Sequence, residues 1–191
     1  MRKKQDSIII RAIFILLISI SITLMGCERM QQQTGIILTA PEKQAKAVIG
    51  SSSDSGISGE AVFTQDGDQI KLMIDIQGAT PGLHAVHIHE HGDCSAPDGT
   101  SAGGHWNPTG VAHGKWGEGE FHLGDIGNIN VEEDGMGSIS LTTDLWEIGT
   151  GSDIDVVGKS IIVHAGADDF TSQPSGAAGM RIGCGVIELS E

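Results

Sequence analysis

The sequence predicts an all-β fold, an antiparallel β-sandwich or barrel of about eight short strands with two long functional loops. Three observations carry this prediction. Apolar residues recur at every second position, as at Ile70, Leu72, Ile74 and Ile76, a period typical of half-buried strands. Turn sequences rich in glycine and aspartate separate the apolar segments. Beyond residue 44 no stretch has the periodicity of an amphipathic helix.

Turn sequences place the boundaries of the expected strands. Asp66-Gly67-Asp68 and Glu133-Asp134-Gly135 are hairpin turns, and Thr80-Pro81-Gly82 is a further turn. The strands are therefore expected at 47–49, 60–65, 69–77, about 83–91, 128–131, 138–141, 160–164 and 181–189. Residues 90–124 and 165–180 have little strand pattern and much glycine. Long loops in a compact domain are usually functional, and both of these follow strands that carry histidine.

The N-terminal residues have the pattern of an export signal. A basic start at Arg2-Lys3-Lys4 precedes a short apolar run that ends at Gly26-Cys27, and the run is too short to span a membrane. Leu24-Met25-Gly26-Cys27 resembles the lipobox of bacterial lipoproteins, which implies cleavage before Cys27 and lipidation of its thiol. A plain secretion signal and an uncleaved N-terminal anchor are the alternatives.

The sequence then divides into a signal at 1–26, a lipid-anchored tether at 27–44 and one domain at 45–191. Removing the signal takes away four basic residues and one acidic residue, leaving 7 basic and 24 acidic residues and a net charge of −17. This acidity argues against nucleic acid or an anionic membrane surface as a partner.

The three cysteines fit an exported protein if one of them carries lipid. Lipidation of Cys27 leaves Cys94 and Cys184, and an oxidising compartment favours a disulfide between them. Two buried free thiols are the alternative.

Four of the eight histidines fall within the stretch from His84 to His91. Side chains two positions apart in a strand share a face, so His87 and His89 point the same way and His84 points the other way. We expect His84 to be a hydrogen-bonded packing residue. His91 would share the face of His87 if the strand continued, but Gly92-Asp93 ends the strand. For His91, surface exposure is favoured over an auxiliary metal contact.

The histidine content predicts a metal site, and two adjacent metals are expected because one ion cannot use so many ligands. The other histidines are His105, His113, His122 and His164, and Asp125 follows His122 closely. Three histidines and an aspartate suit zinc. A site made of His87, His89 and further histidines from elsewhere in the chain would suit copper.

The chain resembles the copper/zinc superoxide dismutase family across most of its predicted domain. The segment from Gly82 to Glu90 is similar to the first signature of the family, with an unusual Val86. The segment from Gly176 to Ile187 is similar to the second, with Ala177 where Asn or Gly is more usual. The spacings from His105 to Asp125 and from His164 to Asp168 also match.

The resemblance implies a Greek-key barrel with two metal ions. The implied copper ligands are His87, His89, His105 and His164. The implied zinc ligands are His105, His113, His122 and Asp125. His105 would then be an imidazolate that bridges the two ions.

The resemblance also implies roles for residues around the metals. Asp168 would hydrogen-bond ligands of both ions, and Arg181 would lie beside copper as a catalytic residue. Cys94 and Cys184 would form the intrachain disulfide.

The implied reaction is the dismutation of superoxide to dioxygen and hydrogen peroxide, with His105 carrying a proton to the second superoxide. The expected location is the extracytoplasmic face of the cell membrane, with attachment through lipid on Cys27. A non-catalytic copper- and zinc-binding lipoprotein for metal storage or delivery is the alternative function.

Overall fold

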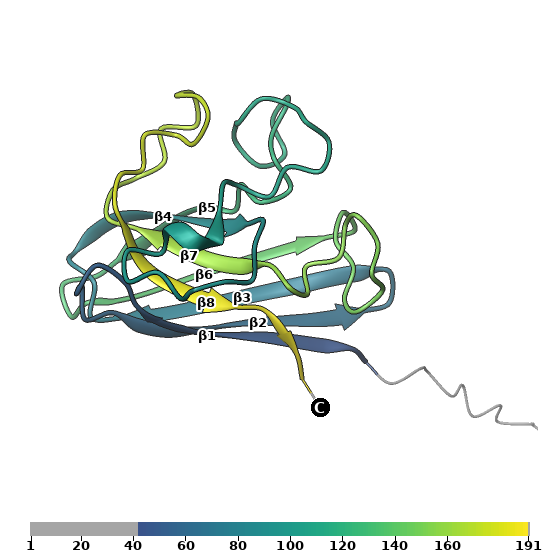
Figure 1. Ribbon diagram of the computed structural model, residues 1–191, viewed down its shortest axis with the longest axis horizontal. Helices are drawn as coiled ribbons and strands as arrows, with labels where there is room; N and C mark the ends of the chain where they lie inside the picture. The colour runs from purple at the N-terminus through teal and green to yellow at the C-terminus, as the bar shows by residue number, and fades with distance from the viewer. Residues whose placement is uncertain (1–41, 191) are drawn as a thin grey trace, which may run out of the picture. The chain divides into compact units, whose positions relative to one another are not determined.

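The computed structural model describes residues 42–190, which form a closed antiparallel β-barrel (Figure 1). The elements of the barrel are β1 (Gln44–Ser51), β2 (Ser58–Asp66), β3 (Gln69–Gln77), β4 (Gly82–His89), η1 (Thr100–Ala102), β5 (Gly127–Val131), β6 (Met136–Thr143), β7 (Ser160–His164), β8 (Arg181–Val186) and β9 (Glu188–Leu189). The predicted signal and most of the predicted tether, Cys27 included, lie outside the described residues.

The strands pair in the order β2-β3-β6-β5-β4-β7-β8-β1-β9, and pairing of β1 with β2 closes the barrel. Every pairing is antiparallel. Because β3 pairs with β6 and β4 pairs with β7, the chain crosses between non-consecutive strands, as in a Greek key. The predicted all-β class is confirmed. Within residues 42–190 no helix has the length and apolar character needed to cross a membrane.

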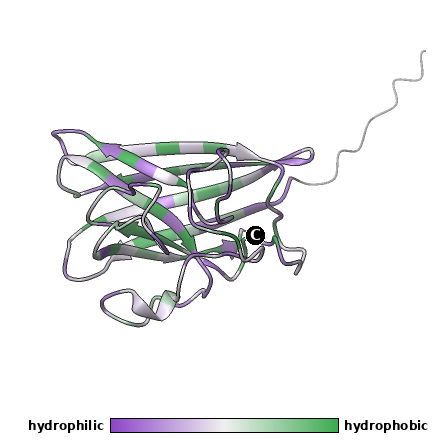
Figure 2. Cartoon of the chain, turned by 90° about the horizontal axis from the view of Figure 1, so that it is seen from above, coloured by the Kyte–Doolittle hydropathy of each residue, from purple (hydrophilic) through white to green (hydrophobic). Residues whose placement is uncertain are grey.

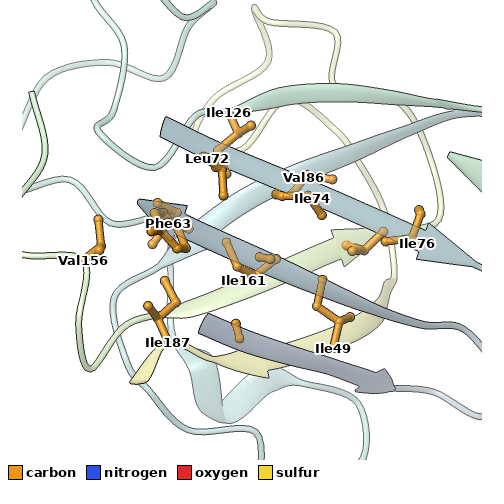
Figure 3. Packing of buried hydrophobic residues seen from close by; sticks show 14 of the residues in the cluster. Ile49, Phe63, Leu72, Ile74, Ile76, Val86, Ile126, Val156, Ile161 and Ile187 are labelled. Carbon is orange, nitrogen blue, oxygen red and sulfur yellow. The ribbon is translucent and has the colours of Figure 1, made fainter. Parts of the chain in front are cut away.

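Alternating side chains fill the interior of the barrel. In β3 the buried positions are those of Ile70, Leu72, Ile74 and Ile76, while the residues between them are exposed. Figure 2 shows this alternation of hydropathy along the strands, and Figure 3 shows the apolar side chains packed between them. The period-two pattern in the sequence therefore marks the face that the core buries.

The strands β4 and β7 are buried on both faces. Every residue of β7, and every residue of β4 from His84 onward, is buried. One face meets the core through Val86 and Ile88. The long loops cover the other face, and both rise from the same side of the barrel (Figure 1). The histidines on that face therefore lie between the sheet and the loops.

Two features differ from the sequence expectations. Residues 144–159 form a third long connection, which contributes Trp146 to the core at 5.8 Å from the ring of Phe63. The expected strand at 181–189 is interrupted at Ile187, whose backbone bonds to Gly158 and Lys159 and separates β8 from β9.

Candidate metal centre

Four histidines converge on the covered face of β4 and β7. His87 and His89 extend from β4, His164 ends β7, and His105 comes from the loop after β4. Each offers a ring nitrogen, and these four nitrogens lie within 4.8 Å of one another. Antiparallel pairing of Val86 with Val163 brings the two strands together at this point. This first group contains the residues expected to bind copper.

A second group adjoins the first and shares His105 with it. Its members are His105, His113, His122 and Asp125, and their ligand atoms also lie within 4.8 Å of one another. All four come from the loop at 90–126. Asp125 Oδ1 is 2.8 Å from His105 Nδ1 and 3.3 Å from His122 Nδ1, and Asp125 Oδ2 is 3.0 Å from His113 Nδ1. Ligands at 2.0–2.1 Å from a tetrahedral ion are about 3.3–3.4 Å apart, so these atoms are close to zinc-ligand spacing.

Six buried histidine nitrogens have no hydrogen-bond partner within residues 42–190. They are Nδ1 of His87, His113 and His122, and Nε2 of His89, His105 and His164. A buried polar atom is normally paired, and a ring that ligates a metal usually donates from its other nitrogen to the protein. The six unpaired nitrogens are therefore available as metal ligands, and the donor set fits two ions.

The opposite nitrogens of these rings are held by the protein. His89 Nδ1–H donates to the carbonyl of Gly103 at 3.0 Å, and His164 Nδ1–H donates to that of Gly179 at 3.2 Å. His122 Nε2–H donates to Val111 O at 3.2 Å. These bonds fix the tautomers, which direct the free nitrogens toward each other.

Burial keeps three members of the first group neutral. It lowers the pKa of His89 to about 2, of His164 to about 3 and of His105 to about 4, although hydrogen bonding to Asp125 raises that of His105 in part. Burial on its own would raise the pKa of Asp125, but hydrogen bonds from the ring of His105 and from the backbone N–H groups of His122 and Gly114 outweigh it and lower this pKa. At neutral pH the centre thus offers neutral imidazoles at His89, His105 and His164 and a carboxylate at Asp125.

Asp168 connects the two groups. It is 3 % exposed, and its carboxylate accepts from His87 Nε2–H at 2.8 Å and from His113 Nε2–H at 3.0 Å. The side chain of Asn128 in β5 makes two hydrogen bonds to the backbone of Asp168. Its Nδ2 donates to Asp168 O at 3.0 Å, and its Oδ1 accepts from Asp168 N–H at 2.7 Å. The sequence did not single out Asn128, because a lone amide at the start of a strand carries no pattern.

Arg181 and the disulfide attach the loop at 90–126 to β8. The guanidinium donates to Gly99 O at 2.6 Å and to Gly103 O at 2.7 Å. Since Gly103 O also accepts from His89, this carbonyl connects the arginine to the first group. A disulfide joins Cys94 to Cys184, which are 90 positions apart.

His84 and His91 lie outside both groups. Nδ1 of His84 bonds to His164 O at 2.8 Å and Nε2 bonds to Thr80 O at 2.8 Å, so His84 is a buried hydrogen-bonded residue, as its parity predicts. His91 lies just beyond the end of β4, exposed, with Nε2 3.0 Å from Glu90 Oε1. The expected surface exposure of His91 is confirmed.

A protein-family model described as copper/zinc superoxide dismutase (SODC) matches residues 57–187. The matched segment includes both groups, Asp168, Arg181 and both disulfide cysteines. It covers most of the chain and every strand from β2 to β8. The chain therefore belongs to the copper/zinc superoxide dismutase family.

Proposed function

We propose that the protein dismutates superoxide to dioxygen and hydrogen peroxide outside the cytoplasm. The first group would bind copper through His87, His89, His105 and His164. The second would bind zinc through His105, His113, His122 and Asp125. The observation that carries the proposal is the set of six unpaired buried nitrogens, arranged in two groups that share His105.

Copper, when bound, supplies the one-electron chemistry, while zinc supplies fixed positive charge and order in the loop. The reaction converts two superoxide anions and two protons into one dioxygen and one hydrogen peroxide. The protein has to bind an anion, deliver protons and hold the ligand rings still.

His105 is suited to proton delivery because its two nitrogens lie in different environments. Nδ1 is 2.8 Å from Asp125, while Nε2 has no partner among residues 42–190. As a bridging imidazolate, His105 would have both nitrogens free of protons. Nε2 would accept a proton during the first half of the cycle and transfer it to the second superoxide.

Arg181 is suited to anion binding. Its side chain is held by two carbonyls of the loop that carries His105, and it is partly exposed. A guanidinium fixed in this way places positive charge next to the first group without having to reorganise when the anion arrives.

The experiment that tests the function measures metal content and dismutation on the same purified protein. We expect one copper and one zinc per chain and rapid dismutation, which is lost on chelation and restored only when copper is added back. Arg181→Ala should retain both metals and lose most of the rate. Copper binding without dismutation would favour storage or delivery of metal over catalysis.

The export and lipid anchor proposed from residues 1–27 need a separate test. Cells that express the full chain should incorporate labelled fatty acid into the protein and place it in the membrane fraction. Cys27→Ala should remove the label and release the domain, which retains its activity. A label that persists in Cys27→Ala would contradict the assignment.

A further inference from the structure

The loop at 165–180 contacts the second group through the side chain of Gln173. Gln173 Oε1 accepts a hydrogen bond from His113 N–H at 2.9 Å, and its Nε2 donates to His113 O at 2.9 Å. The two residues are 60 positions apart in the sequence. One side-chain amide therefore pairs with both backbone groups of His113, as a neighbouring strand would.

The ring of His113 is held by the same loop. Its Nε2–H donates to Asp168 Oδ1 at 3.0 Å. Gly176 makes this approach possible, because a Cβ at that position would lie 2.8 Å from His113 Nε2 and 1.9 Å from Asp168 Oδ1. Backbone and ring of His113 thus both depend on the segment 168–176.

The other members of the second group are held from within their own loop. His122 bonds to Val111 O, and Asp125 accepts from the backbone N–H groups of Gly114 and His122. His105 is held by Asp125. Among the four, only His113 takes its described hydrogen bonds from the loop at 165–180, so its position is the one that this loop can change.

We propose that Gln173 is a positioning residue for zinc, which fixes His113 and couples zinc binding to the order of the loop at 165–180. This inference rests on the proposed function, since it takes the second group to be the zinc site. A contact that stabilises the zinc-bound arrangement of His113 is in turn stabilised by zinc, because coupling between two sites is reciprocal.

The coupling reaches the first group through the ends of the loop. The loop begins after His164, a member of the first group, and ends at Arg181. Gly179 O accepts from His164 Nδ1 at 3.2 Å, and Met180 O accepts from Ala165 N at 2.7 Å. Order in this loop therefore bears on the orientation of His164 as well as on that of His113.

The test compares Gln173→Met, which keeps the length of the side chain and removes both hydrogen bonds, with Gln69→Met at an exposed position of β3. Zinc affinity is measured by chelator competition on the metal-free protein. We expect Gln173→Met to bind zinc about tenfold more weakly, as is usual when a residue that orients a ligand is lost. Gln69→Met should bind as the wild type does. Gln173→Glu keeps the acceptor and loses the donor, so its affinity should fall between the two.

Two further readouts separate positioning from general stability. Cobalt(II) in place of zinc should give a shifted visible absorption band in Gln173→Met and an unchanged band in Gln69→Met. Amide hydrogen exchange over residues 168–176 should slow on zinc binding in the wild type, and should slow much less in Gln173→Met.

The outcomes distinguish the two levels of the proposal. A wild type that binds no zinc would overturn the proposed function together with the role of Gln173. A wild type that binds zinc, with unchanged affinity, cobalt band and exchange in Gln173→Met, would overturn the role of Gln173 alone. A lowered Tm in Gln173→Met with unchanged zinc affinity would also overturn it.

Discussion

The carboxylate of Asp168 accepts a hydrogen bond from Nε2–H of His87 at 2.8 Å, although the two residues are 81 positions apart. The same carboxylate accepts from His113. One buried aspartate therefore orients a ring of each group, and disturbance of either group has a direct path to the other. Five predictions follow from this centre and its surroundings.

Replacement of His87 should affect the copper site and leave the zinc site occupied. His87→Ala removes a nitrogen of the first group and none of the second, so dismutation should fall more than 100-fold while about one zinc per chain is retained. Metal analysis and a superoxide assay on one preparation measure both effects. His91→Ala, at an exposed histidine outside both groups, should change neither. An active His87→Ala protein would refute the copper assignment.

Replacement of Asp125 should loosen the second group. Asp125→Asn removes the negative charge of the group and one acceptor of backbone N–H bonds, so zinc affinity should fall about 100-fold or more. Chelator competition measures the affinity, and hydrogen exchange over residues 103–126 should rise. Asp153→Asn, at an exposed carboxylate, serves as the control. Unchanged zinc affinity in Asp125→Asn would count against its role.

A methyl group at Gly176 should disturb the contact between Asp168 and His113. Gly176 has a φ of +66° and no room for a Cβ, whereas Gly117 has a φ of +77° and nothing within 4 Å of the added atom. Gly117→Ala should lower the free energy of unfolding by about 1–2 kcal/mol, through backbone strain alone. Gly176→Ala adds the steric clash and should lower it by about 2–5 kcal/mol. Urea unfolding measures both free energies. If Gly176→Ala and Gly117→Ala lost the same free energy of unfolding, the loop would have relaxed around the added methyl group, and the prediction would be wrong.

The metal-free protein should lose stability as the pH falls below about 6.5. Burial lowers the pKa of His89 to about 2 and of His164 to about 3. Between those values and 6.5 the unfolded chain binds protons that the folded chain does not, so the free energy of unfolding falls with decreasing pH.

The urea midpoint of the chelated protein, measured from pH 7.5 to about 4.5, tests this dependence. His164→Gln should make the dependence on pH shallower, and His91→Ala should leave it unchanged. A midpoint that is constant or rises toward acid pH would contradict the prediction.

Attraction of superoxide from a distance should be weak. The loop at 165–180 contains Asp168 and Asp169 and no lysine or arginine, and the predicted mature chain has a net charge of −17. Salt at 0.1–0.15 M screens charges beyond about 8–10 Å, which leaves Arg181 as the local attractant. The dismutation rate should therefore vary little with ionic strength.

Adding one positive charge to the loop at 165–180 tests the same prediction in the opposite direction. Ser175→Lys places a lysine in this loop and should raise the rate at low salt more than at high salt. A steep fall of the wild-type rate on addition of salt would contradict the prediction.

The parts of the fold that follow a short-range period could be predicted from the sequence. The alternation from Ile70 to Ile76 gives β3 and its buried face, and the spacing of His87 and His89 gives their common direction. The convergence of His105, His113, His122 and His164 does not follow from spacing. The number of histidines predicts two adjacent metals, but the assignment of each residue to one of them came only from the resemblance to a family in which such residues meet.

Other features leave no local signal in the sequence. Gln173 and Asn128 act through single amides that pair with backbone from distant segments, and such bonds have no periodicity. Trp146 enters the core from an irregular connection. The interruption at Ile187 falls between Val186 and Glu188, with neither proline nor glycine at the break.

The arrangement of β4 between β5 and β7 bears on when the centre can form. His164 reaches His87 only after β7 has paired with β4, and Arg181 and Cys184 come from β8, which pairs with β7. Pairings that distant in sequence form late, because a long loop has to close first. A chain that ends before β7 would lack a member of the first group, so binding of copper would report that nearly the whole domain has been made and has folded.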